Sequence, residues 1–181
     1  MILVTGGSGC GKSSYAENRI QELAKAQGGT IYYLATMQVY GEEGRRKVQR
    51  HIELRRGKGM ITVEQTRNLS GAISKMQDGK RFVILEDLGN LVANEMFLEN
   101  GEVIGAEQVA KKVISDVLTL KRNVEDLVLV TNNVFEDGIH YEDGTMNYMR
   151  ALGQVNAALA NEADEAVEVV VGIPLRMGQE K

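Results

Sequence analysis

The amino-acid sequence predicts an α/β fold, with a mostly parallel, doubly wound sheet flanked by helices. Three observations lead to this prediction. Short runs of β-branched and other apolar residues alternate with segments of helical periodicity, as expected for a sheet with right-handed crossovers. Most of these runs are apolar almost throughout, as in strands that are buried on both faces of a parallel sheet. A glycine-rich segment follows the first run and leads into the first helical segment.

The expected elements alternate along the whole chain. Strands are expected at residues 2–5, 30–36, 61–64, 82–86, 127–131 and 166–171. Helices are expected at residues 12–26, 42–56, 69–76, 88–97, 106–120 and 146–161, and the main loops at 28–29, 57–59, 100–105 and 132–144. Ligands of open α/β sheets bind beyond the carboxyl ends of the strands. The loops after Thr5, Thr36, Glu86 and Thr131 are therefore where we expect a site.

The loop after the first strand carries a phosphate-binding motif. Residues 6–13 match G-x-x-x-x-G-K-[ST] and read Gly6-Gly7-Ser8-Gly9-Cys10-Gly11-Lys12-Ser13. Glycines let the backbone N–H groups turn towards phosphate oxygens, and the N-terminus of the next helix adds partial positive charge. Lys12 is expected to reach the β- and γ-phosphates, and the Ser13 hydroxyl to bind Mg²⁺. The sequence thus predicts a P-loop NTPase-like fold that uses ATP or GTP, with Ser14 among the nucleotide-binding residues and Cys10 as a small spacer.

A carboxylate at a second position completes the usual set of Mg²⁺-binding groups. The run at residues 82–85 delivers Glu86 and then Asp87 to the end of its strand. A carboxylate there can hold Mg²⁺ directly or through water. Position favours this role for Glu86, and it favours capping of the following helix for Asp87.

Length and composition predict one cytoplasmic domain that spans residues 1–181. The single cysteine cannot form an internal disulfide, which fits a reducing compartment. No basic, apolar leader and no run of the roughly 18 apolar residues of a membrane span is found. The net charge of −4 argues against a general nucleic-acid binder. His140, in the polar loop, is expected to be a solvated surface residue.

A basic segment at residues 42–58 contains the other histidine, His51. If the segment is helical, Lys47, His51 and Arg55 lie roughly on one face. Neighbouring cations favour a neutral imidazole, which can act as a nucleophile, and they could also neutralise a triphosphate. From the residues alone, we favour a solvated basic face with an incidental histidine.

Taken together, the motifs resemble the bifunctional adenosylcobinamide kinase/adenosylcobinamide-phosphate guanylyltransferases of cobalamin biosynthesis. The resemblance covers nearly the whole chain. It rests on the order and spacing of Ile2-Leu3-Val4-Thr5-Gly6-Gly7, Tyr33-Leu34-Ala35-Thr36, Arg46-Lys47-Val48-Gln49-Arg50-His51, Arg55, Thr62-Val63-Glu64, Glu86, Asn94, Leu129-Val130-Thr131-Asn132, Gly153, Asn156, Ala163-Asp164-Glu165 and Gly172-Ile173-Pro174.

The resemblance implies a nucleotide-dependent transferase with corrinoid substrates. His51 would attack the α-phosphate of GTP, forming a guanylyl-histidine and releasing pyrophosphate, and GMP would then pass to adenosylcobinamide phosphate. An earlier kinase step would phosphorylate adenosylcobinamide. The resemblance also implies that Arg55 and Glu64 belong to the nucleotide-binding residues, and that the protein is a homo-oligomer, commonly a trimer.

The sequence departs from the family pattern at several positions. Arg56 and Met60 stand where proline and tryptophan are usual, Asp87 replaces a cysteine, and Asn133 and Phe135 replace a glutamate and a glycine. Met149 and Arg150 stand where an Arg-Asp pair is expected. These changes leave two alternatives open: a P-loop kinase of another small metabolite that lacks guanylyltransferase activity, and a non-catalytic nucleotide-binding subunit.

Overall fold

The computed structural model describes residues 1–38, 42, 46, 49 and 57–178, and within them seven strands form one sheet. The strands are β1 (Ile2–Thr5), β2 (Thr30–Ala35), β3 (Met60–Glu64), β4 (Arg81–Glu86), β5 (Asp126–Val130), β6 (Glu165–Val170) and β7 (Ile173–Arg176). Their spatial order is β3-β2-β4-β5-β1-β6-β7. The first six strands are parallel, and only β7 runs antiparallel, against β6.

The strands form because their side chains are apolar on both faces. On β1, Ile2 and Val4 face one apolar cluster while Leu3 faces the other, and on β4 Phe82 and Val83 divide in the same way. All four β4 side chains from 82 to 85 are fully buried. This two-sided burial is the reason for the continuous apolar runs in the sequence.

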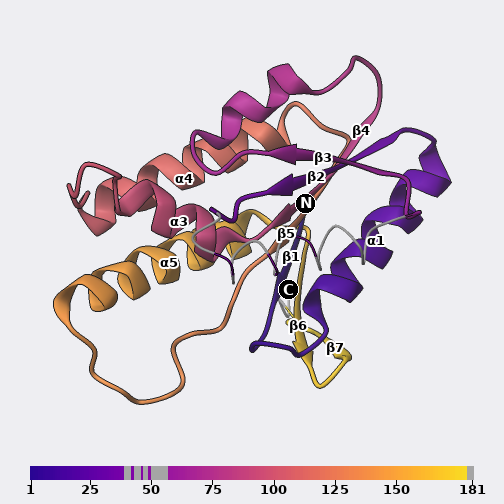
Figure 1. Cartoon of the computed structure of the whole chain (residues 1–181). Coiled ribbons are helices and arrows are strands. Elements are labelled where there is room, and N and C mark those ends of the chain that lie inside the picture. Colours follow the sequence, from indigo (N-terminus) through magenta and orange to yellow (C-terminus); the bar gives the residue numbers. More distant parts are fainter. Residues whose placement is uncertain (39–41, 43–45, 47–48, 50–56, 179–181) are drawn as a thin grey trace.

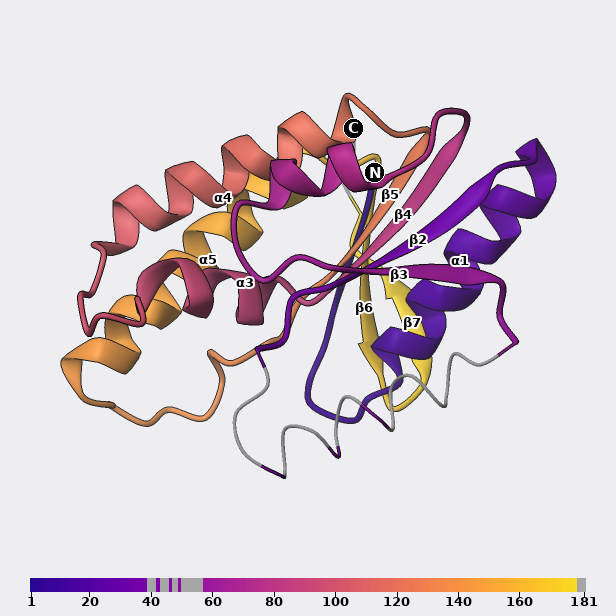
Figure 2. The ribbon, with the colours of Figure 1, turned by 45° about the horizontal axis from the view of Figure 1, so that its top comes forward.

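Helices cover both faces of the sheet (Figure 1). Helix α1 (Lys12–Gln27) packs on one face by its buried stripe Ala16, Ile20 and Ala24. The other face is covered by a 3₁₀ helix, η1 (Leu69–Lys75), and by α3 (Leu88–Met96), α4 (Ala106–Lys121) and α5 (Asp143–Glu162). Figure 2 shows α1 and this second group on opposite sides of the twisted sheet. The predicted fold class is therefore confirmed.

The structure differs from the predicted elements in three places, and a fourth prediction stays untested. Residues 69–76 form a 3₁₀ helix rather than an α-helix. Helix α5 begins at Asp143, so the polar loop predicted at 132–144 ends earlier than expected. Strand β7 was not predicted, because it is short, contains Pro174 and has all four residues exposed. The expected helix at 42–56 falls mostly outside the described residues.

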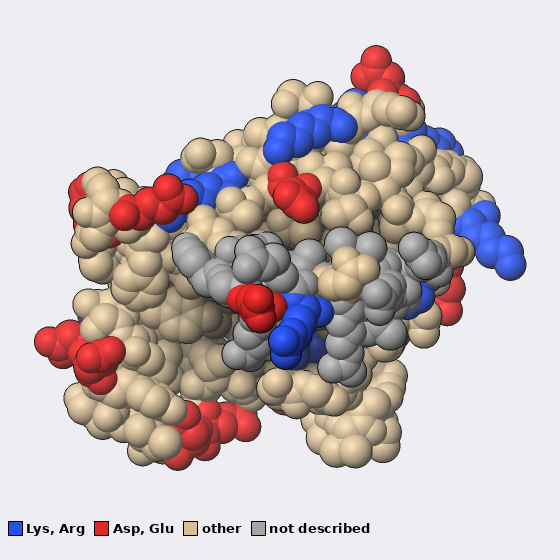
Figure 3. All heavy atoms as spheres, viewed as in Figure 1, with Lys and Arg blue, Asp and Glu red and all other residues tan. Residues whose placement is uncertain are grey.

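The order of the strands brings distant loops to one edge. Strand β5 lies between β1 and β4, so the segments after β1, β4 and β5 all emerge side by side. Figure 3 shows acidic side chains gathered at the end of the molecule that holds the α3–α4 connection and the loop before α5. Among the described residues, no helix is both long enough and apolar enough to cross a lipid bilayer.

Candidate functional site

The glycine-rich loop leaves β1 and enters α1 directly. Gly11 is the N-cap of α1 and makes no side-chain capping bond, so the first N–H groups of the helix are not bound by a capping side chain. A Cβ atom built on Gly7 or Gly9 would meet no atom within 4 Å. The loop therefore has open space beside its backbone, as a phosphate cradle requires.

Lys12 lies over this loop. Its side chain is nearly buried, and its ammonium group donates to the Gly7 carbonyl oxygen at 2.9 Å. A phosphate oxygen is a stronger acceptor for an ammonium group than a neutral carbonyl. Lys12 is thus held next to the place where the β- and γ-phosphates are expected from the motif.

Ser13 and Glu86 are brought together from opposite halves of the sequence. The Ser13 hydroxyl donates to one oxygen of the Glu86 carboxylate in a short hydrogen bond. The Tyr33 hydroxyl donates to the other carboxylate oxygen at 3.0 Å. A hydroxyl and a carboxylate are hard oxygen ligands of the kind that Mg²⁺ prefers, so this pair fits the predicted metal site.

Sequence reasoning missed the contribution of Tyr33. In the sheet Tyr33 pairs with Ile84, two residues before Glu86 and on the same face of β4. A hydroxyl-bearing residue near the carboxyl end of β2 was the available signal. It could be interpreted only once β2 and β4 were known to be neighbours.

Asp87 caps α3, as predicted. One carboxylate oxygen accepts the Asn90 N–H at 2.7 Å, and the other accepts the side-chain amide of Asn132 at 3.1 Å. Burial raises the pKa of Asp87, and the hydrogen bonds from Asn90 and Asn132 oppose this rise. Burial, followed by the negative charge of Asp87, also raises the pKa of the Tyr148 hydroxyl to about 12.

The segment after β5 completes the edge. Asn133 donates its backbone N–H to the Gly6 carbonyl at 3.1 Å. The buried Thr131 hydroxyl donates to the side-chain oxygen of Asn156 at 2.8 Å. Asn133, which stands where the family pattern has a carboxylate, therefore lies directly beside the phosphate loop.

Two of the other matched residues lie at the same edge of the sheet. Glu64 ends β3 with an exposed side chain and pairs with Ala35, which also pairs with Glu86. Asn94 is buried and donates to the carbonyls of Thr36 and Thr66 at 2.7 and 2.9 Å. Asn94 thus joins the segments after β2 and β3, whereas the Glu64 carboxylate is exposed to solvent.

Three of the remaining predicted residues can be placed within the described chain. Ser14 is exposed in the first turn of α1. Cys10 is half-buried against the apolar cluster under α1. His140 is exposed in the loop before α5, as expected.

His51 and Arg55 lie outside the described residues. The described chain resumes at Gly57 and Lys58. The Lys58 ammonium group forms a short ion pair with Glu17 of α1, and the Gln21 side chain donates to the Lys58 carbonyl at 3.2 Å. The end of the basic segment, at Lys58, is therefore fixed to the helix that follows the phosphate loop.

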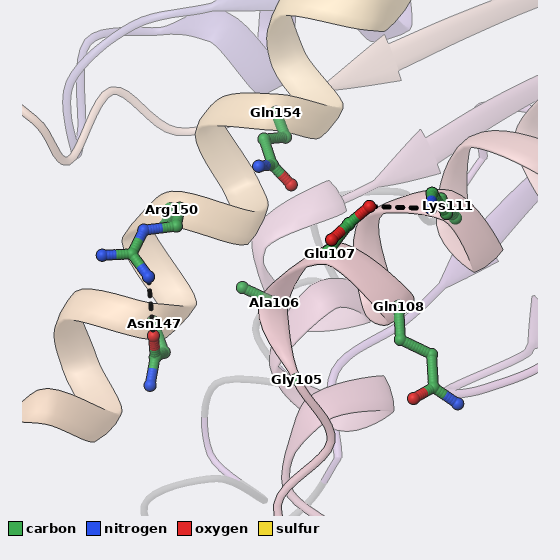
Figure 4. Close-up of a pocket in the computed structure, with 8 residues that line it drawn as sticks. All are labelled: Gly105, Ala106, Glu107, Gln108, Lys111, Asn147, Arg150 and Gln154. Atoms are coloured by element: carbon green, nitrogen blue, oxygen red, sulfur yellow. Dashed lines mark hydrogen bonds and ion pairs between the residues drawn. The ribbon is translucent and has the colours of Figure 1, made fainter.

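A separate hollow of about 610 Å³ lies between α4 and α5. Its wall includes an ion pair between Lys111 and Glu107 and a hydrogen bond from Arg150 to Asn147 (Figure 4). No residue of the phosphate loop lines this hollow. The sheet edge, rather than the hollow, gathers the groups that can bind a nucleotide.

Comparisons with known proteins find relatives that match nearly the whole chain. The family model described as cobinamide kinase / cobinamide phosphate guanyltransferase matches residues 2–177. The bifunctional adenosylcobalamin biosynthesis protein CobU of Escherichia coli is 30% identical over 98% of this chain and 99% of its own length. The protein of the same name from Salmonella typhimurium is 32% identical with the same coverage.

Similar solved structures support the fold. A KaiC-like protein of Pyrococcus horikoshii superposes with a TM-score of 0.51 at 15% identity, over 92% of this chain and 69% of the other. A second structure, an ATPase domain, has the same TM-score at 10% identity, over 92% and 68% of the two chains. At such identities the likeness concerns the fold alone.

Proposed function

The chain belongs to the cobinamide kinase / cobinamide phosphate guanyltransferase family, and from that premise we propose how its residues divide the two reactions. The family is bifunctional and serves adenosylcobalamin biosynthesis. The phosphate loop binds the triphosphate of the nucleotide in both reactions. The convergence of Lys12, Ser13 and Glu86 at one edge of the sheet is the observation that supports this assignment.

In the kinase reaction, the hydroxyl oxygen of adenosylcobinamide attacks the γ-phosphorus. The new O–P bond forms as the bond between the γ-phosphorus and its bridging oxygen breaks, the nucleoside diphosphate leaves, and the hydroxyl proton is released to solvent. Lys12 and the loop N–H groups bind the phosphate oxygens. Ser13 and Glu86 would hold Mg²⁺, which when bound neutralises the charge on the β- and γ-phosphates.

In the guanylyl transfer, an imidazole nitrogen of His51 attacks the α-phosphorus of GTP and pyrophosphate leaves. A phosphate oxygen of adenosylcobinamide phosphate then attacks the same phosphorus, which regenerates the histidine and gives adenosylcobinamide-GDP. Arg55 and Glu64 take part in binding the nucleotide. The anchoring of Lys58 on α1 supports this assignment, because it holds the end of the basic segment against the helix that follows the phosphate loop.

Labelled GTP tests the histidine step. With the label on the α-phosphate, we expect the protein to acquire a label that is labile to acid and stable to alkali. The His51→Ala variant should lose it, and His140→Ala, which removes the exposed histidine, should keep it. Labelling that survives in His51→Ala would refute the assignment.

Labelled γ-phosphate tests the kinase step. We expect transfer to adenosylcobinamide that requires Mg²⁺ and is lost in Lys12→Ala. Transfer of the γ-label with no α-label on the protein would favour the second candidate, a kinase alone. Asn133, at the position of the family's carboxylate and hydrogen-bonded to Gly6, is the observation that motivates that candidate.

We also propose a cytoplasmic homo-oligomer, a trimer by the family resemblance, that acts on small-molecule substrates. Sedimentation equilibrium of the full chain tests the subunit number. A single species with the mass of one chain at micromolar concentration would contradict the proposal.

A further inference from the structure

The turn between β6 and β7 packs against the phosphate loop. The Gly172 N–H donates to the Cys10 carbonyl at 2.8 Å. A Cβ atom on Gly11 would lie 3.4 Å from the Gly172 Cα, and one on Gly6 would lie 2.5 Å from the Val169 carbonyl oxygen. Figures 1 and 2 both show the β6–β7 turn next to the segment that joins β1 to α1. The turn and the loop therefore form one continuous surface.

Val171 in this turn combines two unfavourable features. Its backbone has φ of 49°, in the left-handed region, which a β-branched residue adopts only with strain. Its side chain is 87% exposed. Both turn residues, Val171 and Gly172, have positive φ, and asparagine followed by glycine is the usual choice for such a turn. Neither backbone preference nor packing against the described residues therefore explains a valine here.

The layout of the sheet gives the direction in which a bound nucleotide would extend. Ser13 and Glu86 mark the side of the loop that faces β4, and this pair would hold the Mg²⁺ that neutralises the β- and γ-phosphates. Strands β6 and β7 lie on the opposite side of β1. A triphosphate with its γ end towards Glu86 would project its nucleoside away from β4, towards the β6–β7 turn.

We propose that Val171 is an apolar contact for the nucleobase of the nucleotide held by the phosphate loop. The inference rests on the proposed function, which places the phosphates in that loop. An aliphatic side chain packs against the flat face of a base and forms no hydrogen bond with its edge. The contact therefore adds affinity for adenine and guanine nucleotides alike, and it has no effect on free polyphosphate.

The test compares Val171→Gly with the unaltered protein by calorimetry. The ligands are Mg²⁺ complexes of non-hydrolysable ATP and GTP analogues and of inorganic tripolyphosphate. Removing the valine side chain should lower the affinity for both nucleotides about three- to tenfold, as for the loss of one buried aliphatic group. The affinity for tripolyphosphate should stay unchanged. Because glycine tolerates the left-handed backbone, the melting temperature should stay the same or rise.

Two further variants separate a base contact from a general effect of losing an exposed valine and from a change in the turn. Val103→Gly, which removes an equally apolar side chain that is 56% exposed in the α3–α4 connection, should leave every affinity unchanged. Val171→Asn, which suits the turn but is polar, should weaken the nucleotides as Val171→Gly does.

The outcomes distinguish the inference from the function on which it rests. Unchanged nucleotide affinity in Val171→Gly, or an equal loss for tripolyphosphate, would overturn the base contact alone. Failure of tripolyphosphate to bind the unaltered protein, or undiminished binding in Lys12→Ala, would overturn the phosphate site and the base contact together.

Discussion

Replacing Gly6 with alanine should destabilise the fold, because the added Cβ atom would clash with the backbone of β6. Gly6 has φ of 152°, and a Cβ atom there would lie 2.5 Å from the Val169 carbonyl oxygen and 2.7 Å from the Cys10 sulfur. Non-bonded heavy atoms rest at roughly 3.5 Å or more. The carbonyl belongs to the backbone of β6, so it can move only if the strand moves away from the phosphate loop.

The expected magnitude follows from two contributions. Overpacking of this kind destabilises by about 1–3 kcal/mol, and a positive φ at a residue with a Cβ adds about 1 kcal/mol. The free energy of unfolding of Gly6→Ala should therefore fall by about 2–4 kcal/mol. For a chain of 181 residues this corresponds to a drop of roughly 5–15 °C in melting temperature.

Gly7→Ala is the matched control in the same loop. A Cβ atom on Gly7 would meet nothing within 4 Å. We expect its free energy of unfolding to stay within about 0.5 kcal/mol of the unaltered protein. Urea unfolding followed by circular dichroism measures the stability of both variants, provided that the free energy of unfolding depends on urea concentration with the same slope. Equal stability of Gly6→Ala and Gly7→Ala would refute the steric argument.

Three other changes have defined outcomes. Glu86→Gln keeps an oxygen that accepts from one of its two hydroxyl partners, offers an amide N–H to the other, and removes the charge. Mg²⁺-dependent γ-phosphate transfer should therefore fall by about 10²–10³-fold, while the free energy of unfolding changes by less than about 1 kcal/mol. Lys112→Met leaves the buried carboxylate of Glu95 without its ammonium partner, and it should destabilise by about 1–2 kcal/mol in urea unfolding. In the unaltered protein, the hydrogen bond and charge of the Met1 ammonium group lower the pKa of Asp164, and Asp164→Asn removes this ion pair. The stabilisation by the ion pair is therefore full above the ordinary aspartate pKa, and it is lost as the pH falls through the lowered pKa of Asp164.

Each of these predictions has its own control. Phosphoryl transfer by Glu86→Gln at the unaltered rate would exclude the carboxylate from the metal site. Lys111→Met breaks a fully solvated pair with Glu107 and should be nearly neutral, so equal losses in the two lysine variants would contradict the effect of burial. The stability difference between Asp164→Asn and the unaltered protein should vanish at low pH. If it persists undiminished there, it does not come from the titration of Asp164.

Local sequence predicted the elements well because burial on both faces leaves a strong pattern. The runs at 82–86 and 127–131 correspond to β4 and β5 within a residue at each end. Strand β7 escaped this pattern because an exposed edge strand needs no apolar run and tolerates Pro174. Helix α5 begins three residues before the predicted start at Met146, since its first turn is polar.

The site was predictable only to the extent that its motifs are local. The phosphate loop, Glu86 at a strand end and Asp87 as a cap each depend on a few neighbouring residues. The contacts of Tyr33 with Glu86 and of Gly172 with Cys10 depend on which strands are neighbours. Strand order is set by packing of the whole sheet, and the sequence of one segment does not specify it.

The position of β1 has a consequence for folding during synthesis. Strand β1 is synthesised before the other six strands of the sheet, yet its partners are β5 and β6, and Ile2 pairs with Glu165. Pairings between such distant segments form slowly, since a long stretch of chain must first be ordered. The half of the sheet made of β2, β3 and β4 has its strand partners much earlier. We therefore expect nascent chains that end before β6 to fail to bind nucleotide, although all of their phosphate-loop residues have already been made.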